Sequence, residues 1–530
     1  MNTGTPRPRS NRRKRYTRLC LSMAVVIALP ATLAVGQANA GPRPADYSAG
    51  QSDHDRRDKP RTIVTTDIET DDYNSVIRYL MYTNEVDTEA IVYTSSRFHF
   101  AGDGKGTTFF LPGREYDEPV TSWRWTGTQH IQDLIGEYAK GYRNLLKHDR
   151  GYPSPEKLLS LVKVGNINFE GDMAAPTEGS DAIKNVLLDN KGGPVYLQVW
   201  GGSNTIARAL LSIEEQYRDT PQWMAIYAKV SAKAVITMQG KQDTTYDNYI
   251  SVKWPNILTT NVGSGTWGFY GKNSTKPVDP EAVKYFDGRW IAANILENGP
   301  LGDKYRVWGD KKALAGDPLD IFGDLTNTSG WLPPRERFDF LSEGDNPAFI
   351  YLFDTGLRSL EDWTYGGWGH RVVQSTSTPN YWVSGPAEKN KAGVDVRGYG
   401  SGRWAEAGQL DFAARLGWMS ASNYDDANHH PVVSVKSGLD VNAKPGRKIT
   451  ISGDVRDPDG DRVTTRWWQY READTYPGEV GIADSSALST TVTIPADAKP
   501  GDTVHLILEA TDSGKPALTR YQRVIVHIVK

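Results

Sequence analysis

Cysteine is almost missing from this chain of 530 residues, which contains a single one, Cys20. Cys20 lies in a basic and apolar N-terminal segment that we expect to be removed. The mature chain would then have no disulfide, no thiol nucleophile and no cysteine-ligated metal. An excess of basic charge is missing too, because the formal net charge is −3 at pH 7. Removal of residues 1–40 takes away seven Arg and Lys and no acid, which moves this charge to −10. Nucleic-acid binding needs a basic surface, so we expect no nucleic-acid partner.

Long hydrophobic runs are missing as well, apart from LSMAVVIALPATLAV near the N-terminus. That run is too short for a comfortable transmembrane helix, so we expect no membrane span. It follows a basic segment and precedes the small residues ANA at 38–40, which is the pattern of a secretory signal peptide. The pair Arg12–Arg13 suggests the twin-arginine export route. We therefore expect a signal peptide at residues 1–40, a polar Pro/Gly-rich linker at residues 41–60, and a secreted protein.

Aromatic residues, by contrast, are plentiful, with 16 Trp and 26 Tyr. A hydrophobic fraction of 38% and a charged fraction of 24% are otherwise typical of a soluble globular protein. Most of these aromatic side chains are expected in the core. A surplus of them is also what sugar-binding surfaces use, because an aromatic face packs well against apolar C–H groups.

Strand-like and helix-like patterns alternate after the linker. Strands are predicted at RTIVTTD (61–67), TEAIVYTSS (88–96) and VYLQVWGG (195–202), and amphipathic helices at YNSVIRYLMYTN (73–84) and SNTIARALLSIEEQY (203–217). This alternation predicts an α/β fold, a mostly parallel sheet with helices on both faces. Such sheets bind ligands at the carboxyl ends of their strands.

The pattern changes around NYDDANHHP, residues 423–431. Short β-rich runs follow, such as KITISGDV, VTTRWWQYRE and TVHLILEATD, and turn signals such as DPDGD and DSGKPA separate them. That spacing is typical of an all-β sandwich of immunoglobulin-like type. We therefore expect an α/β domain at residues 61–425 and a β-sandwich domain at residues 426–530.

Four acids crowd the end of the first predicted strand: Asp67, Glu69, Asp71 and Asp72. Carboxylates in a strand–turn–helix can converge on one point above the strand end, and hard cations such as Ca²⁺ favour such oxygen ligands. Alternatively, Asp71 and Asp72 cap the following helix and stabilise its N-terminus through the helix dipole. The local pattern leaves both interpretations open.

Three motifs along the chain resemble the inosine–uridine-type nucleoside hydrolases. TTDIETDD resembles their aspartate-rich motif, with Thr65 standing where the first Asp of the family lies. WGGSNTIARAL, which begins at Trp200, resembles a segment whose first carbonyl binds calcium in that family. SEGDNPAFIYL resembles the family's HD motif, with Asp345 as the metal-binding Asp and Gly344 in place of the His.

A closer resemblance is to one branch of that superfamily. Its members are secreted cellulose-binding proteins with a nucleoside-hydrolase-like domain and a C-terminal β domain. VTTDIETDDYNSVIRYLMYTNEVDTEAIVYTSS, PTEGSDAI and EGDNPAFIYL are similar to the first domain, and RWWQYREADTYPG is similar to the second. The resemblance covers nearly all of residues 61–530.

The superfamily resemblance implies a bound Ca²⁺ held by Asp67, Asp72, Asp345 and the carbonyl of Trp200. Such a cation can lower the pKa of a water molecule, whose proton Asp67 could then take. The water would attack an anomeric carbon, as in inverting glycoside cleavage. Asp71 would accept hydrogen bonds from sugar hydroxyls.

Further candidates for substrate contact are Asn204 and Ser96 in the pocket wall. Gly344 removes the His that assists base departure in nucleoside hydrolases, which argues against a purine or pyrimidine leaving group. His370, in YGGWGHRV, could supply a proton to a sugar leaving group. It could equally be a loop His packed among neighbouring Trp side chains.

Two features of the tail have two interpretations each. Asp457, Asp459 and Asp461 in DPDGD could ligate a second calcium. The same residues form a common turn between sandwich strands, which is the interpretation that we favour. Trp467 and Trp468 alternate across a strand, so one should face the core and the other the opposite side. The outward Trp could stack on a glucan or pack against the first domain.

The sequence features and the family resemblance leave three candidate functions. The first is a secreted Ca²⁺-dependent hydrolase of glycosyl bonds acting on a polysaccharide or oligosaccharide, with cellulose as a candidate. The second is a non-catalytic cellulose-binding protein that keeps the calcium site as a scaffold. The third is a salvage nucleoside hydrolase, which the export signal and the missing His disfavour. Retention of Asp67 favours the hydrolase, whereas the lack of a convincing general acid favours the binder.

Overall fold

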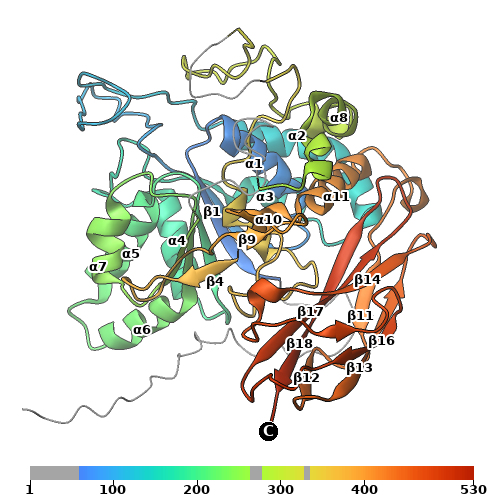
Figure 1. The fold of residues 1–530 in the computed structure, drawn as a ribbon. Helices are drawn as coiled ribbons and strands as arrows, with labels where there is room; N and C mark the ends of the chain where they lie inside the picture. The colour runs from blue at the N-terminus through green and yellow to red at the C-terminus, as the bar shows by residue number, and fades with distance from the viewer. Residues whose placement is uncertain (1–58, 263–276, 327–334, 370) are drawn as a thin grey trace, which may run out of the picture. The chain divides into compact units, whose positions relative to one another are not determined.

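The computed structural model describes residues 59–262, 277–326, 335–369 and 371–530. The predicted signal peptide, most of the predicted linker and His370 lie outside the described residues. Two regions are visible, an α/β domain followed by a β-rich domain (Figure 1).

A single large sheet forms the centre of the first domain. Its strands are β1 (Arg61–Thr66), β2 (Asp87–Tyr93), β3 (Val162–Val164), β4 (Val195–Val199), β5 (Ala234–Met238), β6 (Leu258–Asn261), β7 (Val372–Gln374) and β8 (Tyr381–Ser384). The strand order is β3-β2-β1-β4-β5-β6-β8-β7. Neighbouring strands are parallel except β7 and β8, which run antiparallel. The predicted mostly parallel sheet is confirmed.

Helices cover both faces of this sheet. The described α-helices of this domain are α1 (Thr70–Met81), α2 (His130–His148), α3 (Pro155–Leu161), α4 (Glu178–Leu188), α5 (Asn204–Tyr217), α6 (Trp223–Lys233), α7 (Ser251–Lys253), α8 (Gly288–Ile291), α9 (Gly299–Gly302), α10 (Tyr399–Gly402) and α11 (Ala405–Trp418). Ile63 and Val64 show the two faces, because successive strand side chains point to opposite sides. Val64 packs into a core with α1, α2 and α11, and Ile63 into a core with α4, α5 and α6. All six residues of β1 are buried, as expected for a strand covered on both faces.

The C-terminal region consists of two four-stranded sheets. Its strands are β11 (Val432–Val435), β12 (Asp440–Ala443), β13 (Lys448–Arg456), β14 (Thr464–Gln469), β15 (Gly481–Ile482), β16 (Ser489–Thr493), β17 (Thr503–Thr511) and β18 (Thr519–Ile528). The sheets have the orders β11-β13-β16-β15 and β12-β18-β17-β14, and their pairs are antiparallel except β12 with β18. A short hairpin, β9 (Glu388–Lys389) with β10 (Asp395–Val396), precedes α10.

The two C-terminal sheets share one apolar core. Trp467 of β14 and Leu506 of β17 meet Ile451 of β13 and Val492 of β16 in it. This packing supports the predicted sandwich of two sheets, and its immunoglobulin-like type stays a prediction.

Trp467 and Trp468 face opposite sides of β14, as the alternation predicts. Trp467 is buried in the core of the C-terminal sheets. Trp468 packs against Trp404 of the first domain, with ring centroids 5.8 Å apart, and its indole N–H donates to Glu509 at 3.0 Å. Of the two roles open for the outward Trp, the structure places it against the first domain.

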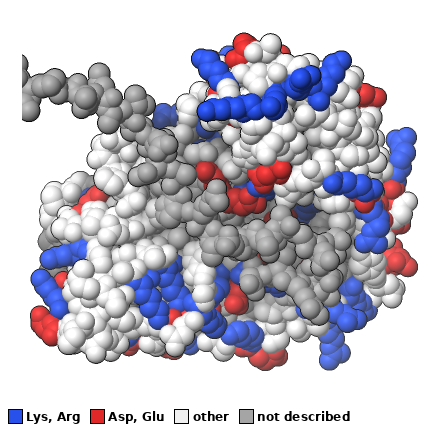
Figure 2. All heavy atoms as spheres, turned by 90° about the horizontal axis from the view of Figure 1, so that it is seen from below, with Lys and Arg blue, Asp and Glu red and all other residues white. Residues whose placement is uncertain are grey.

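The surface carries both signs of charge. Basic and acidic side chains are interspersed over the face seen in Figure 2. None of the helices in the described part of the chain combines the length and the apolar character that crossing a membrane requires.

Candidate functional site

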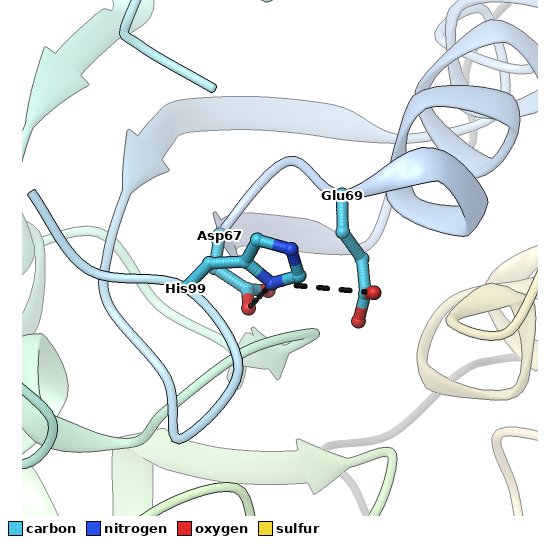
Figure 3. A group of neighbouring side chains, drawn as sticks. All are labelled: Asp67, Glu69 and His99. Atoms are coloured by element: carbon cyan, nitrogen blue, oxygen red, sulfur yellow. Dashed lines mark hydrogen bonds and ion pairs between the residues drawn. The ribbon is translucent and has the colours of Figure 1, made fainter. Parts of the chain in front are cut away.

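The acidic turn lies directly after β1, at the carboxyl end of a central strand. Ile68 sits in the middle of this turn with φ of 50°, a left-handed conformation that β-branched residues rarely adopt. Strain of this kind concentrates at functional sites, where the surrounding structure holds it in place. In Figure 3 the carboxylates of Asp67 and Glu69, the two neighbours of Ile68 in the sequence, both approach the side chain of His99.

Helix α1 begins at Thr70, three residues earlier than its sequence pattern predicts. Glu69 is therefore the N-cap residue, and its side chain makes no capping hydrogen bond. Asp71 and Asp72 lie inside the first turn, where the helix dipole favours negative charge, so neither of them occupies the cap position. The hydroxyl of Thr66 donates a hydrogen bond to Oδ1 of Asp72 and fixes that carboxylate.

A histidine that the sequence reasoning missed stands at the centre of this cluster. The Nδ1 atom of His99 lies 3.3 Å from Oδ2 of Asp67 and 4.0 Å from Oε2 of Glu69. Its Nε2 atom lies 3.5 Å from Oδ2 of Asp317. Burial alone would lower the pKa of His99, but the charge of Glu69 and the bonds to Asp317 and Asp67 raise it to about 10. His99 is therefore positively charged at neutral pH.

Asp317 was missed as well, and Arg124 holds it in place. The guanidinium of Arg124 donates to both carboxylate oxygens of Asp317, at 2.9 and 3.0 Å. Burial opposes ionisation, but the ion pair with His99 and the hydrogen bonds from Arg124 lower the pKa of Asp317 to about 2. Asp317 is thus an anion that fixes the outer edge of the His99 ring.

Three carboxylate oxygens in this cluster have no hydrogen-bond partner although they are buried: Oδ1 of Asp67, Oδ2 of Asp72 and Oδ2 of Asp345. Burial raises the pKa of Asp72 and of Asp345, and the neighbouring carboxylates raise both further. Buried, unpartnered and mutually repelling oxygens are costly without a compensating charge. A hard cation such as Ca²⁺ supplies that charge, so the donor set fits the predicted metal.

Glu69, which had no role in the sequence reasoning, belongs to the most compact parts of the cluster. Within two groups, Asp67–Glu69–His99 and Glu69–Asp71–Asp72, the candidate ligand atoms all lie within 4.8 Å of one another. Burial raises the pKa of Glu69, and the charges of Asp71 and Asp67 add to this effect against the opposing charge of His99. The acidic cluster therefore consists of Asp67, Glu69, Asp71, Asp72 and Asp345.

Asp345 reaches the cluster from a distant part of the sequence through contacts with α1. The side-chain amide of Asn74 donates to the carbonyl of Ser342 at 3.0 Å. The hydroxyl of Ser75 accepts from the backbone N–H of Asp345 at 3.4 Å. These hydrogen bonds hold Asp345 beside α1, although the two are about 270 residues apart in the sequence. The charge of Asp72 can therefore raise the pKa of Asp345.

Trp200 follows β4, the strand next to β1, and its backbone N–H donates to the carbonyl of Thr65 at 2.9 Å. A Cβ atom on the next residue, Gly201, would lie 2.7 Å from Oδ1 of Asp67, so this turn runs directly beside the cluster. The carbonyl of Trp200 accepts a hydrogen bond from Nε2 of Gln242 at 2.6 Å. The role of this carbonyl as a metal ligand stays a prediction.

The side chains of Ser96 and Asn204 hold loops in place. The hydroxyl of Ser96 accepts from the backbone N–H groups of Phe98 and His99, at 2.9 and 3.1 Å. Asn204 is fully buried and bonds to the hydroxyls of Thr94 and Ser95. Both residues thus position the segment after β2 that carries His99.

Comparisons with known proteins place these features in a family. A family model described as "Cellulose-binding Sde182, nucleoside hydrolase-like domain" matches residues 61–372. A second, described as "Cellulose-binding protein Sde0182, C-terminal domain", matches residues 448–528. No curated protein sequence matches the chain.

One solved structure is similar over most of the chain. It is a nucleoside hydrolase-related hypothetical protein from Saccharophagus degradans that is described as associated with carbohydrate metabolism. The identity is 25% and the TM-score 0.65, and the match covers 89% of this chain and 100% of that one.

Two other solved structures match only a small share of the chain. Domains 4 and 5 of the S-layer protein SbsC are 19% identical, with a TM-score of 0.14, over 19% of this chain and 54% of that one. Murine CRIg is 11% identical, with a TM-score of 0.15, over 19% of this chain and 100% of that one. These TM-scores are too low to support an argument. The first family model alone spans more than half of the sequence, and the chain therefore belongs to the family described as cellulose-binding Sde182, nucleoside hydrolase-like domain.

Proposed function

We propose that this is a secreted carbohydrate-active protein whose first domain hydrolyses a glycosyl bond with the help of Ca²⁺. One observation carries the proposal. Asp67 has one buried oxygen without a partner, while its other oxygen lies 3.3 Å from His99. A carboxylate that only held a structural ion would not need a charged histidine fixed on its other side by a second acid.

The residues that would hold the cation are Asp67, Asp72, Asp345 and the carbonyl of Trp200. When bound, the cation would supply polarisation of a water molecule and so make its proton easier to remove. Glu69 and Asp71 lie in the same cluster. We propose that Asp71 accepts hydrogen bonds from sugar hydroxyls.

Asp67 is the proposed general base. It would take a proton from the attacking water as that water approaches the anomeric carbon. His99 orients Asp67 through its Nδ1 atom, and its positive charge limits the build-up of negative charge in the cluster. Asp317 and Arg124 hold the His99 ring in that orientation. The departing sugar also needs a proton, for which His370 stays the predicted donor.

The second candidate is a non-catalytic cellulose-binding protein. The description of the family favours it, because that description names cellulose binding and a domain that is only like a hydrolase. In this case the cation would stabilise the strand ends, and the same carboxylates would serve as a scaffold.

Turnover separates the two candidates. The wild type and Asp67→Asn are incubated with a panel of soluble and insoluble glycans, with Ca²⁺ or with a chelator. Release of reducing ends by the wild type with Ca²⁺, lost in Asp67→Asn, supports the hydrolase. Unchanged pull-down on cellulose by both proteins, with no turnover by either, overturns the hydrolase and supports the binder.

A further inference from the structure

One end of the C-terminal sandwich brings together polar side chains from three loops. The turn between β13 and β14 contributes Asp457, Asp459 and Asp461, whose candidate ligand atoms lie within 4.8 Å of one another. The loop between β17 and β18 contributes Asp512, and the segment before β11 contributes Asn428. Asn428, Asp459 and Asp461 all line one open hollow.

The turn interpretation explains only half of Asp457. Its Oδ1 atom accepts hydrogen bonds from the backbone N–H groups of Asp459 and Asp461, at 3.0 and 2.9 Å. Its Oδ2 atom is buried and has no hydrogen-bond partner. The hydrogen bonds of the turn account for Oδ1 of Asp457, but they do not explain why Oδ2 is buried without a partner.

Asn428 provides an independent indication, because its amide orientation is fixed. Its Nδ2 atom donates to Oδ1 of Asp512 at 3.1 Å and to the carbonyl of Pro516 at 2.7 Å. Both partners are acceptors, so the nitrogen must face them and the oxygen must face the other way. That oxygen has no partner although the residue is only 8% exposed.

Asp512 repeats this arrangement. Its Oδ1 atom accepts from the backbone N–H groups of Gly514 and Leu518, at 2.9 and 3.0 Å, in addition to Asn428. Its Oδ2 atom is buried without a partner, in a residue that is 5% exposed. Asp512 thus has one bonded and one unpartnered oxygen, like Asp457.

We propose that this end of the sandwich is a second Ca²⁺ site, with ligand oxygens from Asp457, Asp461, Asp512 and Asn428. The donors are all oxygens, the set that Ca²⁺ prefers, and no described nitrogen or sulfur atom is needed. Asp459 is engaged elsewhere, because its carboxylate accepts from the backbone and ring of His429 at 2.7 and 2.9 Å.

The role of this site is to strengthen the connection between three loops that strand pairs and single hydrogen bonds already bring together, such as Val432 with Arg456 and Asn428 with Asp512. Binding to the folded state alone raises stability by mass action. The site lies apart from the acidic cluster after β1, so it is independent of the proposed hydrolysis.

Calcium binding by the full chain tests the proposal. Asp72→Asn disables the first site, and isothermal titration calorimetry then counts the Ca²⁺ that remains. We expect one Ca²⁺ per chain. Adding Asp457→Asn and Asp461→Asn should weaken this binding at least tenfold, because the amides keep the turn's acceptors and lose its charges. The matched control is Asp454→Asn, an exposed acid of β13 paired with Lys436, which should leave the affinity unchanged.

Two results would overturn the site. The first is that Asp72→Asn alone binds no Ca²⁺, and the second is that binding persists unchanged in the triple variant. If the triple variant does not fold, Asp461→Asn in the Asp72→Asn background gives the same test, because its amide oxygen can still accept from the hydroxyl of Ser513. This test measures Ca²⁺ binding and no turnover. Its result can therefore be interpreted even if the wild type has no hydrolase activity.

Discussion

The acidic cluster of the first domain and the residues around it are single side chains from distant parts of the sequence, and the motifs identified only some of them. Asp67, Asp71, Asp72 and Asp345 stand in motif positions, so their presence in one cluster could be predicted. His99 lies three residues beyond a predicted strand, at the sheet edge where ligands bind, and that position was its only signal. Asp317 lies in a loop without a pattern, and only tertiary contacts bring it to His99.

Charge crowding at Asp72 leads to a first prediction. Burial and the neighbouring acids raise its pKa, so ionised Asp72 costs folding free energy when no cation is bound. Asp72→Asn removes that charge, and its amide oxygen can still accept from Thr66. In chelator at pH 8 we expect a midpoint of thermal unfolding higher by roughly 2–5 °C. Asp133→Asn, in the exposed first turn of α2, should give no such gain. An equal or lower midpoint for Asp72→Asn would show that the crowded charge is not destabilising.

In the proposed hydrolysis, His99 is a positioning residue for Asp67. His99→Gln should lower kcat for glycosyl hydrolysis by about 10–100-fold, because Asp67 loses the partner that orients it. KM and binding to cellulose should stay close to those of the wild type. Steady-state kinetics together with a cellulose pull-down check this split. A rise in KM with kcat unchanged would instead place His99 in substrate binding.

Secondary structure followed from the sequence more closely than the site did. The buried runs at β1, β2 and β4 and the alternation in β13 and β14 appear where the patterns predict them. The start of α1 differs, because Asp71 and Asp72 are stable in a first helical turn and extend the helix towards β1. The extension places Asp71 and Asp72 in the first turn of α1, close to the end of β1, and the helical periodicity alone did not predict this placement.

The close approach of the β4 turn to Asp67 can be tested at Gly201. Gly201→Ala would place a Cβ atom 2.7 Å from Oδ1 of Asp67, so one of them must move. We expect lower stability and a loss of Ca²⁺ binding at this site, measured by calorimetry. The control is Gly136→Ala in α2, where a Cβ atom meets no neighbour, and it should stabilise by about 0.5–1 kcal/mol. Unchanged Ca²⁺ affinity in Gly201→Ala would contradict the placement of this turn beside the metal.

We expect His505 on β17 to make the C-terminal sheets sensitive to acid. Burial, and then the charge of Arg523, lower its pKa to about 2, whereas an unfolded His has a pKa of about 6.5. Between these values the unfolded chain binds more protons, so stability is present above pH 6.5 and falls as the pH drops, by about 1.4 kcal/mol per pH unit.

His505→Asn should remove this slope between pH 6 and pH 4, because the amide oxygen can still accept from Arg523. Denaturant unfolding at several pH values measures it. His527→Asn, an exposed His of β18, is the control and should keep the slope. An unchanged slope in His505→Asn would assign the acid sensitivity to other groups.

Across the whole molecule, the fold class and both family regions agree with the sequence, and the division of function between the domains is a proposal. In the first domain, Asp67, Asp72 and Asp345 each have one buried oxygen without a hydrogen-bond partner, and the second domain turns one Trp towards the first. The proposed hydrolysis depends on the cation site of the first domain, so its central claim is that occupancy of this site controls turnover.

Turnover as a function of site occupancy tests this most directly. The protein carries Asp457→Asn and Asp461→Asn, so that only the first site binds Ca²⁺. Bound Ca²⁺ is removed with a chelator, and the protein is then titrated with Ca²⁺. Reducing-end release and calorimetric binding are measured on the same samples. If the first domain is a Ca²⁺-dependent hydrolase, the rate of reducing-end release rises in proportion to Ca²⁺ occupancy of the first site and stays at background in Asp67→Asn. Full turnover in chelator, or no turnover on any glycan at full occupancy, would contradict it.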